Sequence, residues 1–236
     1  MSHTSQRRGL SPDKPGQEMI VLAMLPSSAK DKPGAKSAMS DLAGRMMDHA
    51  PDNWIIKNAT EIHVPDLGPA EGLARFLHQH WPEKTDRLLM RAAGYLSTVI
   101  TALYTDVKNV EELITELKGE WLENNREKDL PVSIVLSGLF KDVHECCQKT
   151  GTTEHTYLHS LGFYGNVADL PAPDELEIIT MCGHGLIATN RVRDLAGKVR
   201  AGAISAREAA QDVARPCVCG IVNVDRAEKI FECLAG

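Results

Sequence analysis

The chain has 236 residues, of which 43% are hydrophobic, so it is long enough to bury an ordinary core without disulfide staples. A formal net charge of -6 at pH 7 gives no basic field for a polyanion, and we expect no nucleic-acid partner. The longest apolar stretch, 88–104, contains Arg91 and is shorter than the roughly 20 residues that cross a bilayer, so we expect no membrane segment. Six cysteines without an apolar export signal favour a reducing, cytoplasmic environment.

The first half of the chain shows helical periodicity more often than strand alternation. Residues 1–16 are polar and rich in Pro, Ser and Gly, and they predict a mobile tail. A charged linker over 124–129 marks a soft boundary, so residues 17–129 are expected to form a helix-rich N-terminal part. Apolar spacing predicts these elements within it: a strand over 19–25, a helix over 35–49, one or two strands over 54–64, and helices over 69–80, 86–104 and 109–121.

The second half, residues 130–236, mixes strand and helix signals. The expected fold class is therefore mixed α/β, with a C-terminal α/β part that either stands apart or continues the first part as one domain. The predicted elements are strands over 132–136, 157–163 and 176–181, and helices over 139–149, 189–200, 205–215 (opened by an S-x-x-E capping box) and 224–234.

Two short cysteine loops in the C-terminal part share one sequence pattern. Each loop is expected to lead into a helix, whose first N–H groups and partial positive charge favour a thiolate over a thiol. Gly183, Gly185 and Gly220 are expected to let the backbone approach a bound group closely. The pattern repeats at an offset of 35 residues, as Cys182-x-x-Gly185-Leu-Ile-x-x-Asn190-Arg191 and Cys217-x-x-Gly220-Ile-Val-x-x-Asp225-Arg226.

The third position of the repeated loop carries a metal-ligand side chain in both copies, His184 and Cys219. Soft thiolates dominate the candidate ligands, and the Cys-x-Cys spacing of 217–219 differs from the Cys-x2-Cys of zinc knuckles, so we favour a 4Fe-4S cluster over zinc. The zinc alternative takes the Cys3His set Cys182, His184, Cys217 and Cys219, and the cluster exchanges His184 for Cys146 or Cys147.

The remaining candidates are supported less directly. Cys146 and Cys147 are adjacent on a predicted helix and point about 100 degrees apart, so only one is expected to reach the site. Cys233 lies on the apolar side of the last predicted helix and is interpreted as a core residue. Arg191 is a candidate for binding the cofactor or an anion, but a solvated helix position is the main expectation for both Arg191 and Arg226.

Residues 181–185, Met-Cys-Gly-His-Gly, resemble the loop of proline racemase-like enzymes in which a cysteine is one of two thiol acid-base catalysts. Pro216-Cys217 is similar to the second loop of that family. The resemblance covers these two short loops alone. It implies that Cys182 and Cys217 are paired catalytic thiols and that His184 supports substrate binding.

The main functional expectation is a 4Fe-4S protein. If one iron stays open, the resemblance and the loops predict an enzyme that acts on a small carboxylate-bearing substrate, with Cys182 and His184 as catalytic groups. A closed cluster predicts electron transfer with a redox partner protein or structural support. Two alternatives remain: a metal-free thiol enzyme with Cys182 and Cys217 as acid and base, and a zinc-stabilised module that binds a partner protein.

Overall fold

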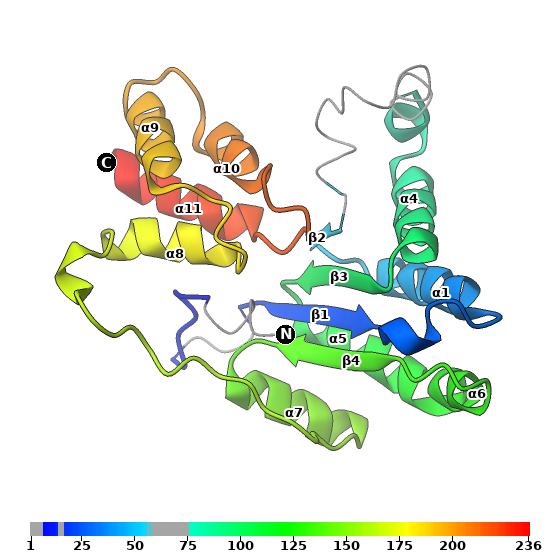
Figure 1. Ribbon diagram of the computed structural model, residues 1–236. Helices are drawn as coiled ribbons and strands as arrows, with labels where there is room; N and C mark the ends of the chain where they lie inside the picture. Colours follow the sequence, from blue (N-terminus) through cyan, green and yellow to red (C-terminus); the bar gives the residue numbers. More distant parts are fainter. Residues whose placement is uncertain (1–6, 14–16, 56, 58–75) are drawn as a thin grey trace.

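The computed structural model describes residues 7–13, 17–55, 57 and 76–236 (Figure 1). Within these ranges the chain forms a four-stranded antiparallel sheet with the strand order β2-β3-β1-β4. The register sets Val21 of the central strand β1 opposite Ala102 of β3 and Leu136 of β4. The strands are β1 (Met19–Met24), β2 (Asn53–Trp54), β3 (Val99–Tyr104) and β4 (Ser133–Ser137).

Helices make up most of the other regular structure, which confirms the mixed α/β class. None of the helices in the described ranges is both long and apolar enough to span a bilayer. A π-helical turn at Leu117–Trp121 joins α5 to α6. The α-helices that lie wholly within the described ranges are α1 (Ala35–Asp48), α4 (Pro82–Leu96), α5 (Val107–Glu116), α6 (Leu122–Glu127), α7 (Phe140–Thr150), α8 (Pro173–Met181), α9 (Thr189–Arg200), α10 (Ala206–Ala214) and α11 (Val224–Ala235).

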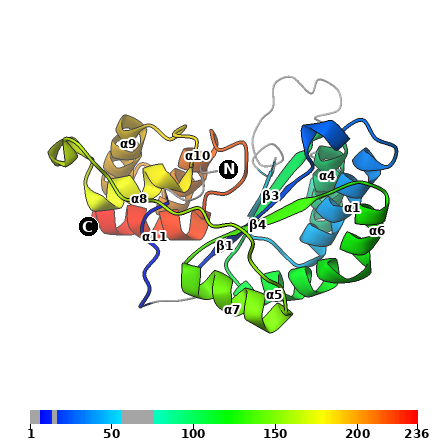
Figure 2. The ribbon, with the colours of Figure 1, turned by 60° about the horizontal axis from the view of Figure 1, so that its bottom comes forward.

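Side chains that alternate along the strands divide the apolar core between the two faces of the sheet. Val21 and Tyr104 point into a core made with α1, α4 and α5. Ile20 and Leu103 point the other way, into a second core made with α8, α9, α10 and α11. In both ribbon views α8–α11 form a group apart from α5 and α7 (Figures 1 and 2). The cysteine loops belong to this second, helical layer.

The sheet joins the two predicted parts of the chain. β4 follows the charged segment 124–129, yet it pairs with β1 along five residue pairs. β2 and β3 complete the sheet from the N-terminal half. The structure therefore places residues from both sides of the expected boundary in one sheet.

Three predicted elements fold differently. Residues 99–104 form β3 rather than the end of a helix, because α4 ends at Leu96 and Ser97 is already extended. Residues 176–181 belong to helix α8, which starts with Pro173. Its N-terminus is capped by a hydrogen bond from the Ala172 N–H to the Glu175 carboxylate (3.2 Å). The strand expected over 157–163 has no regular structure.

Other predictions fall partly outside the described residues. The strands expected over 54–64 are represented by β2, and residues 58–64 lie outside the described ranges. Residues 76–80 are helical, as expected, and residues 69–75 lie outside those ranges.

Two arginines are more buried than their sequence setting indicates. Residues 7–9 of the expected mobile tail pack against α8, and the Arg7 side chain is 3% exposed. The Arg226 side chain, for which a solvated position was the main expectation, is 11% exposed. Both surround the buried carboxylate of Glu18, which needs positive partners inside the protein.

Candidate functional site

The two cysteine loops meet in the second core. Cys182 caps the C-terminal end of α8, and Cys217 follows α10. Both residues are 1% exposed and pack with Ile178, Ile187 and Phe231 in one apolar cluster. The Cys217 thiol is hydrogen-bonded to the Cys182 sulfur. The structure thus brings the two cysteines together in this cluster, and we call them the inner pair.

The repeated sequence pattern is also a repeated conformation. The Gly185 N–H donates to the Cys182 carbonyl at 3.0 Å, and the Gly220 N–H donates to the Cys217 carbonyl at 3.0 Å. Both glycines have positive φ, +68° and +60°, which favours glycine over any other residue. Gly183 is half-buried and does not share this left-handed conformation.

Backbone N–H groups point at both sulfurs of the inner pair. The N–H groups of His184 and Leu186 donate to Cys182, and the N–H of Ile221 donates to Cys217. These donors belong to the loops and not to the first turns of α9 and α11, which begin several residues later. The expected helix termini are therefore replaced by loop amides, which stabilise negative charge in the same way.

The two sulfurs of the inner pair have pKa values shifted in opposite directions. The hydrogen bond from Cys217 outweighs burial and, with the loop N–H groups, lowers the pKa of Cys182 to about 5. The same hydrogen bond, together with burial, raises the pKa of Cys217. Near neutral pH the pair is therefore a thiolate on Cys182 beside a thiol on Cys217, with the thiolate as the softer and more nucleophilic ligand.

The third positions of the two loops form an outer pair, His184 and Cys219. The Cys219 sulfur lies 3.7 Å from Nδ1 of His184. Cys219 is half-buried, and His184 is exposed. Burial and the neighbouring Cys182 raise the pKa of Cys219. The outer pair lies between the inner pair and solvent, where it can supply further ligands or move protons.

Three cysteines and His184 are the metal-ligand side chains of the two loops. In the described part of the chain, no three His, Cys, Asp or Glu side chains converge to hold a single metal ion. Zinc needs its ligands about 2.0–2.3 Å from one common centre. A 4Fe-4S cluster binds each thiolate through a different iron and accepts more widely spread sulfurs. The loops offer three cysteine sulfurs and one imidazole, and loop N–H groups donate to two of the sulfurs.

The structure leaves the other cysteines away from this site. Cys146 and Cys147 lie on α7, which packs against α5. Burial raises the pKa of Cys146 to about 12. Cys233 is exposed, so its interpretation as a core residue is wrong. It follows the buried Phe231 by two residues, or about 200 degrees around α11, and therefore faces solvent.

Residues that the sequence does not point to hold the second loop against the sheet. A Cβ on Gly220 would lie 1.7 Å from the carbonyl oxygen of Trp54 in β2. Thr101 of β3 donates its hydroxyl to the Cys219 carbonyl, and Asn53 donates its side-chain amide to the Val222 carbonyl at 2.8 Å. No local motif marks these partners, because they come from strands far away in the chain.

A shallow pocket of about 360 Å³ adjoins both loops. Arg191, a predicted anion-binding residue, lines it but is already paired with Asp194 and Asp212. Arg215 lines the same pocket beside Pro216. The pocket thus combines an apolar wall, Leu186–Ala188, with two guanidinium groups that are both paired with the carboxylate of Asp212.

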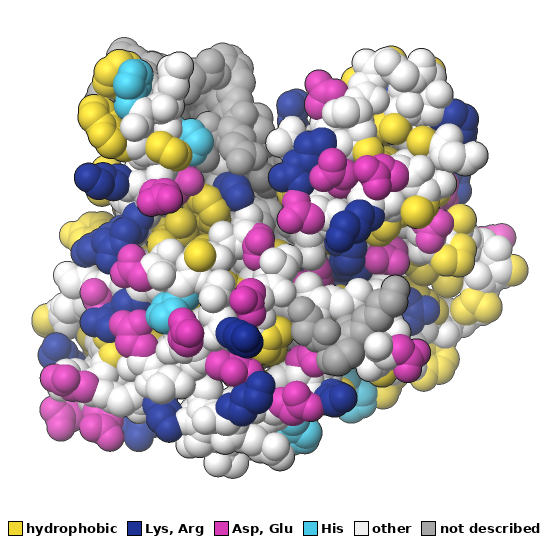
Figure 3. All heavy atoms as spheres, turned by 180° about the vertical axis from the view of Figure 1, so that it is seen from behind, with side chains coloured by type: hydrophobic (Ala, Val, Ile, Leu, Met, Phe, Trp, Pro, Cys, Tyr) yellow, Lys and Arg dark blue, Asp and Glu magenta, His cyan; other side chains and the backbone are white. Residues whose placement is uncertain are grey.

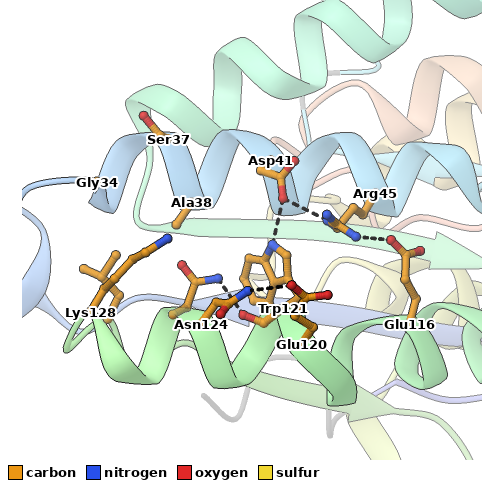
Figure 4. Close-up of a pocket in the computed structure, with 12 residues that line it drawn as sticks. Gly34, Ser37, Ala38, Asp41, Arg45, Glu116, Glu120, Trp121, Asn124 and Lys128 are labelled. Carbon is orange, nitrogen blue, oxygen red and sulfur yellow. Dashed lines mark hydrogen bonds and ion pairs between the residues drawn. The ribbon is translucent and has the colours of Figure 1, made fainter.

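A second pocket, of about 580 Å³, lies between α1 and the segment from α5 to α6 and is lined by no residue of the cysteine loops (Figure 4). Asp41 accepts hydrogen bonds from Trp121 Nε1 at 2.7 Å and from Arg45 Nε at 2.8 Å. Arg45 also pairs with Glu116. The polar groups of Asp41, Arg45, Glu116 and Trp121 are thus hydrogen-bonded or ion-paired with one another.

On the face of the molecule seen in Figure 3, basic and acidic side chains are interspersed.

Comparisons with protein-family models, with curated protein sequences and with solved structures give no match for this chain. The resemblance of the Met181–Gly185 loop to racemase-like enzymes therefore stays a local expectation.

Proposed function

We propose that the protein is an iron-sulfur protein whose 4Fe-4S cluster is held by Cys182, Cys217 and Cys219. The observation that carries the proposal is the pairing of two loops with the same turn hydrogen bond, which places Cys182 beside Cys217 and Cys219 beside His184. His184 takes the fourth position or leaves it to a substrate. Cys146 and Cys147 are not needed, because they lie on α7 with α5.

The loops of this chain prepare the thiolates for such a group. N–H groups of His184, Leu186 and Ile221 lower the cost of negative charge on the inner pair. When bound, a 4Fe-4S cluster supplies one-electron transfer or, at an iron without a thiolate, a Lewis-acidic position. The pocket beside the loops presents Arg191 and Arg215, and we propose that they orient a small carboxylate-bearing substrate.

Anaerobic purification followed by iron and sulfide analysis tests the proposal. We expect a brown protein with about four iron and four sulfide ions per chain after reconstitution. Cys182→Ser, Cys217→Ser and Cys219→Ser should each lose most of the iron. Cys233→Ser is the matched control, because that thiol is exposed on α11 and away from the loops, and it should keep the wild-type content.

Three results separate the proposal from its alternatives. A colourless protein without iron after anaerobic reconstitution contradicts it. Stoichiometric zinc bound through the same cysteines and His184 would instead support the Cys3His centre. Iron loss in Cys147→Ser equal to that in Cys217→Ser would show that α7 contributes a ligand, contrary to its placement.

The inner pair favours one second candidate, a metal-free thiol enzyme. A thiolate on Cys182 beside a thiol on Cys217 has the two protonation states that a paired acid and base require. The sulfurs would have to separate to admit a substrate, since they are now hydrogen-bonded to each other. This candidate predicts activity that survives chelation and is abolished by alkylation of either thiol.

Titration of the metal-free protein checks the state of the inner pair. As the pH is lowered, the ultraviolet absorbance of the thiolate should fall with a midpoint near pH 5, the pKa of Cys182. An ordinary thiol has a pKa of 9.0. Cys217→Ala should raise this midpoint, because it removes the hydrogen bond that stabilises the Cys182 thiolate. An ordinary midpoint in the wild-type protein would contradict the thiolate–thiol pair.

A further inference from the structure

A buried charged network lies directly behind the cysteine loops. Its centre is Glu18, the residue before β1, which is 1% exposed. Arg7 Nε donates to the Glu18 carboxylate at 3.0 Å, Arg226 Nη2 at 3.0 Å, and Asn223 Nδ2 at 2.8 Å. Burial alone would raise the pKa of Glu18, but Arg7 and Arg226 hold it below its usual range. The carboxylate is therefore ionised and fully enclosed by its partners.

The guanidinium of Arg7 also bridges the two loops. Its Nη1 donates to the carbonyl of Met181 and, at 2.7 Å, to the carbonyl of Ile221. Met181 immediately precedes Cys182, and Ile221 supplies the N–H that bonds the Cys217 sulfur. One planar group with fixed donors thus ties the backbone of each loop to the other.

The residues next to Arg7 anchor it on α8. The Arg8 N–H donates to Thr180 Oγ1 at 3.0 Å, and the Arg8 carbonyl accepts from Arg226 Nη1 at 2.8 Å. Gly9 has a φ of +87°, and a Cβ there would lie 1.9 Å from Cδ of Glu177. A side chain at this position would meet both strain and a clash. We call residues 7–9 the N-terminal strap.

We propose that Arg7 is a positioning residue of the centre and that the N-terminal strap clamps the two cysteine loops in their paired geometry. The identity of the centre rests on the proposed function, but the clamp is a property of the metal-free protein as well. Arg226 also pairs with Glu177 at 2.7 Å, so two positive and two negative side chains balance in the network. The main contribution of Arg7 to the site is therefore the hydrogen bonds that hold the two loops together, and not its positive charge.

Hydrogen exchange of the full-length, metal-free protein tests the clamp. Loss of two hydrogen bonds from a charged donor should make the amides of 182–187 and 217–222 exchange about tenfold faster or more in Arg7→Gln. Arg8→Gln is the matched control. It removes the same charge from the next residue, but its guanidinium lies over the Phe163 ring, 4.5 Å from the centroid, and not on the loops. Its loop amides should exchange at the wild-type rate.

Arg7→Lys separates geometry from charge. It keeps the positive charge but lacks the planar fork, so we expect it to behave like Arg7→Gln. Wild-type protection in Arg7→Lys, or equal protection in Arg7→Gln and Arg8→Gln, would overturn the proposal. If Arg7→Gln loses its fold by circular dichroism, Gly9→Ala replaces it. That variant keeps Arg7 but strains the strap at its left-handed residue, and unchanged loop protection in it would also overturn the proposal.

A second readout connects the clamp to the centre. In reconstituted protein, Arg7→Gln should release iron to a chelator about tenfold faster than Arg8→Gln, because opened loops expose the ligands. Equal release rates would show that Arg7 does not position the ligands. Absence of iron from every variant would contradict the proposed function, and the exchange result would still decide the clamp.

Discussion

Gly185 and Gly220 occupy the same position of the repeated loop in different surroundings. Both have positive φ. A Cβ on Gly185 meets nothing within 4 Å, whereas one on Gly220 would overlap the carbonyl of Trp54 at 1.7 Å. An alanine at the first position therefore costs only the left-handed conformation. An alanine at the second also forces the Cys217 loop away from β2.

We expect Gly185→Ala to lower the free energy of unfolding by about 1–2 kcal/mol, the cost of a left-handed L-residue. Gly220→Ala should lower it by more than about 4 kcal/mol, because a backbone carbonyl cannot move aside alone. Urea titration measures both changes, and iron content should fall in Gly220→Ala while Gly185→Ala keeps it. Equal losses in the two variants would contradict the close approach of the loop to β2.

For single residues, the sequence predicts the two cysteine loops but not the residues that pack against them. The offset repeat alone predicts that Cys182 and Cys217 lie in equivalent turns, because pattern and backbone conformation are local. The approach of Trp54 to Gly220 depends on sheet assembly. So does the burial of Arg7, whose polar neighbours in the chain are typical of a tail.

Helix α4 packs along α1 with unusually close backbones at Gly94. A Cβ there would lie 2.5 Å from the carbonyl oxygen of Met39 and 2.9 Å from the Ala43 side chain. Gly197 in α9 offers the opposite case, since a Cβ there meets nothing within 4 Å. The same substitution in two helices thus separates packing from helix propensity.

Gly94→Ala should destabilise the protein by about 1–3 kcal/mol, because overpacking outweighs the gain in propensity. Gly197→Ala should stabilise it by about 0.5–1 kcal/mol, because alanine loses less conformational entropy in a helix. Thermal and urea unfolding measure both. Stabilisation by Gly94→Ala would show that α1 and α4 lie farther apart than described.

The helices that depend on local apolar spacing are predicted correctly from the sequence. A strand that depends on pairing with distant strands is not. α9, α10 and α11 match their predicted ranges closely, since capping and apolar spacing are encoded within each segment. Residues 99–104 share the apolar character of α4 but form β3, because β1 and β2 offer hydrogen-bond partners on both sides. No feature within that stretch of sequence reports those partners.

At the scale of the whole molecule, Glu18 joins the sheet to the helical layer. It precedes β1 and is bonded to Asn223 and Arg226 of the helical layer and to Arg7 of the N-terminal strap. Its side chain is 1% exposed, so solvent cannot replace a lost partner. The attachment of α8–α11 to the sheet therefore depends on this carboxylate as well as on apolar contacts.

Glu18→Gln should lower the free energy of unfolding at pH 7 by about 3–5 kcal/mol, because it leaves the buried Arg7 guanidinium without its counter-charge and removes one of the two carboxylates that pair with Arg226. Asp48→Asn, which breaks an exposed pair with Arg87, should cost about 1 kcal/mol or less. The folded protein lowers the pKa of Glu18 from its usual 4.5, so the ionised carboxylate stabilises the fold above that value. This stability is lost as the pH falls through the lowered pKa. Urea titrations at several pH values should therefore show a wild-type advantage that is full near neutrality and shrinks in acid, and an advantage independent of pH would contradict an ionised Glu18.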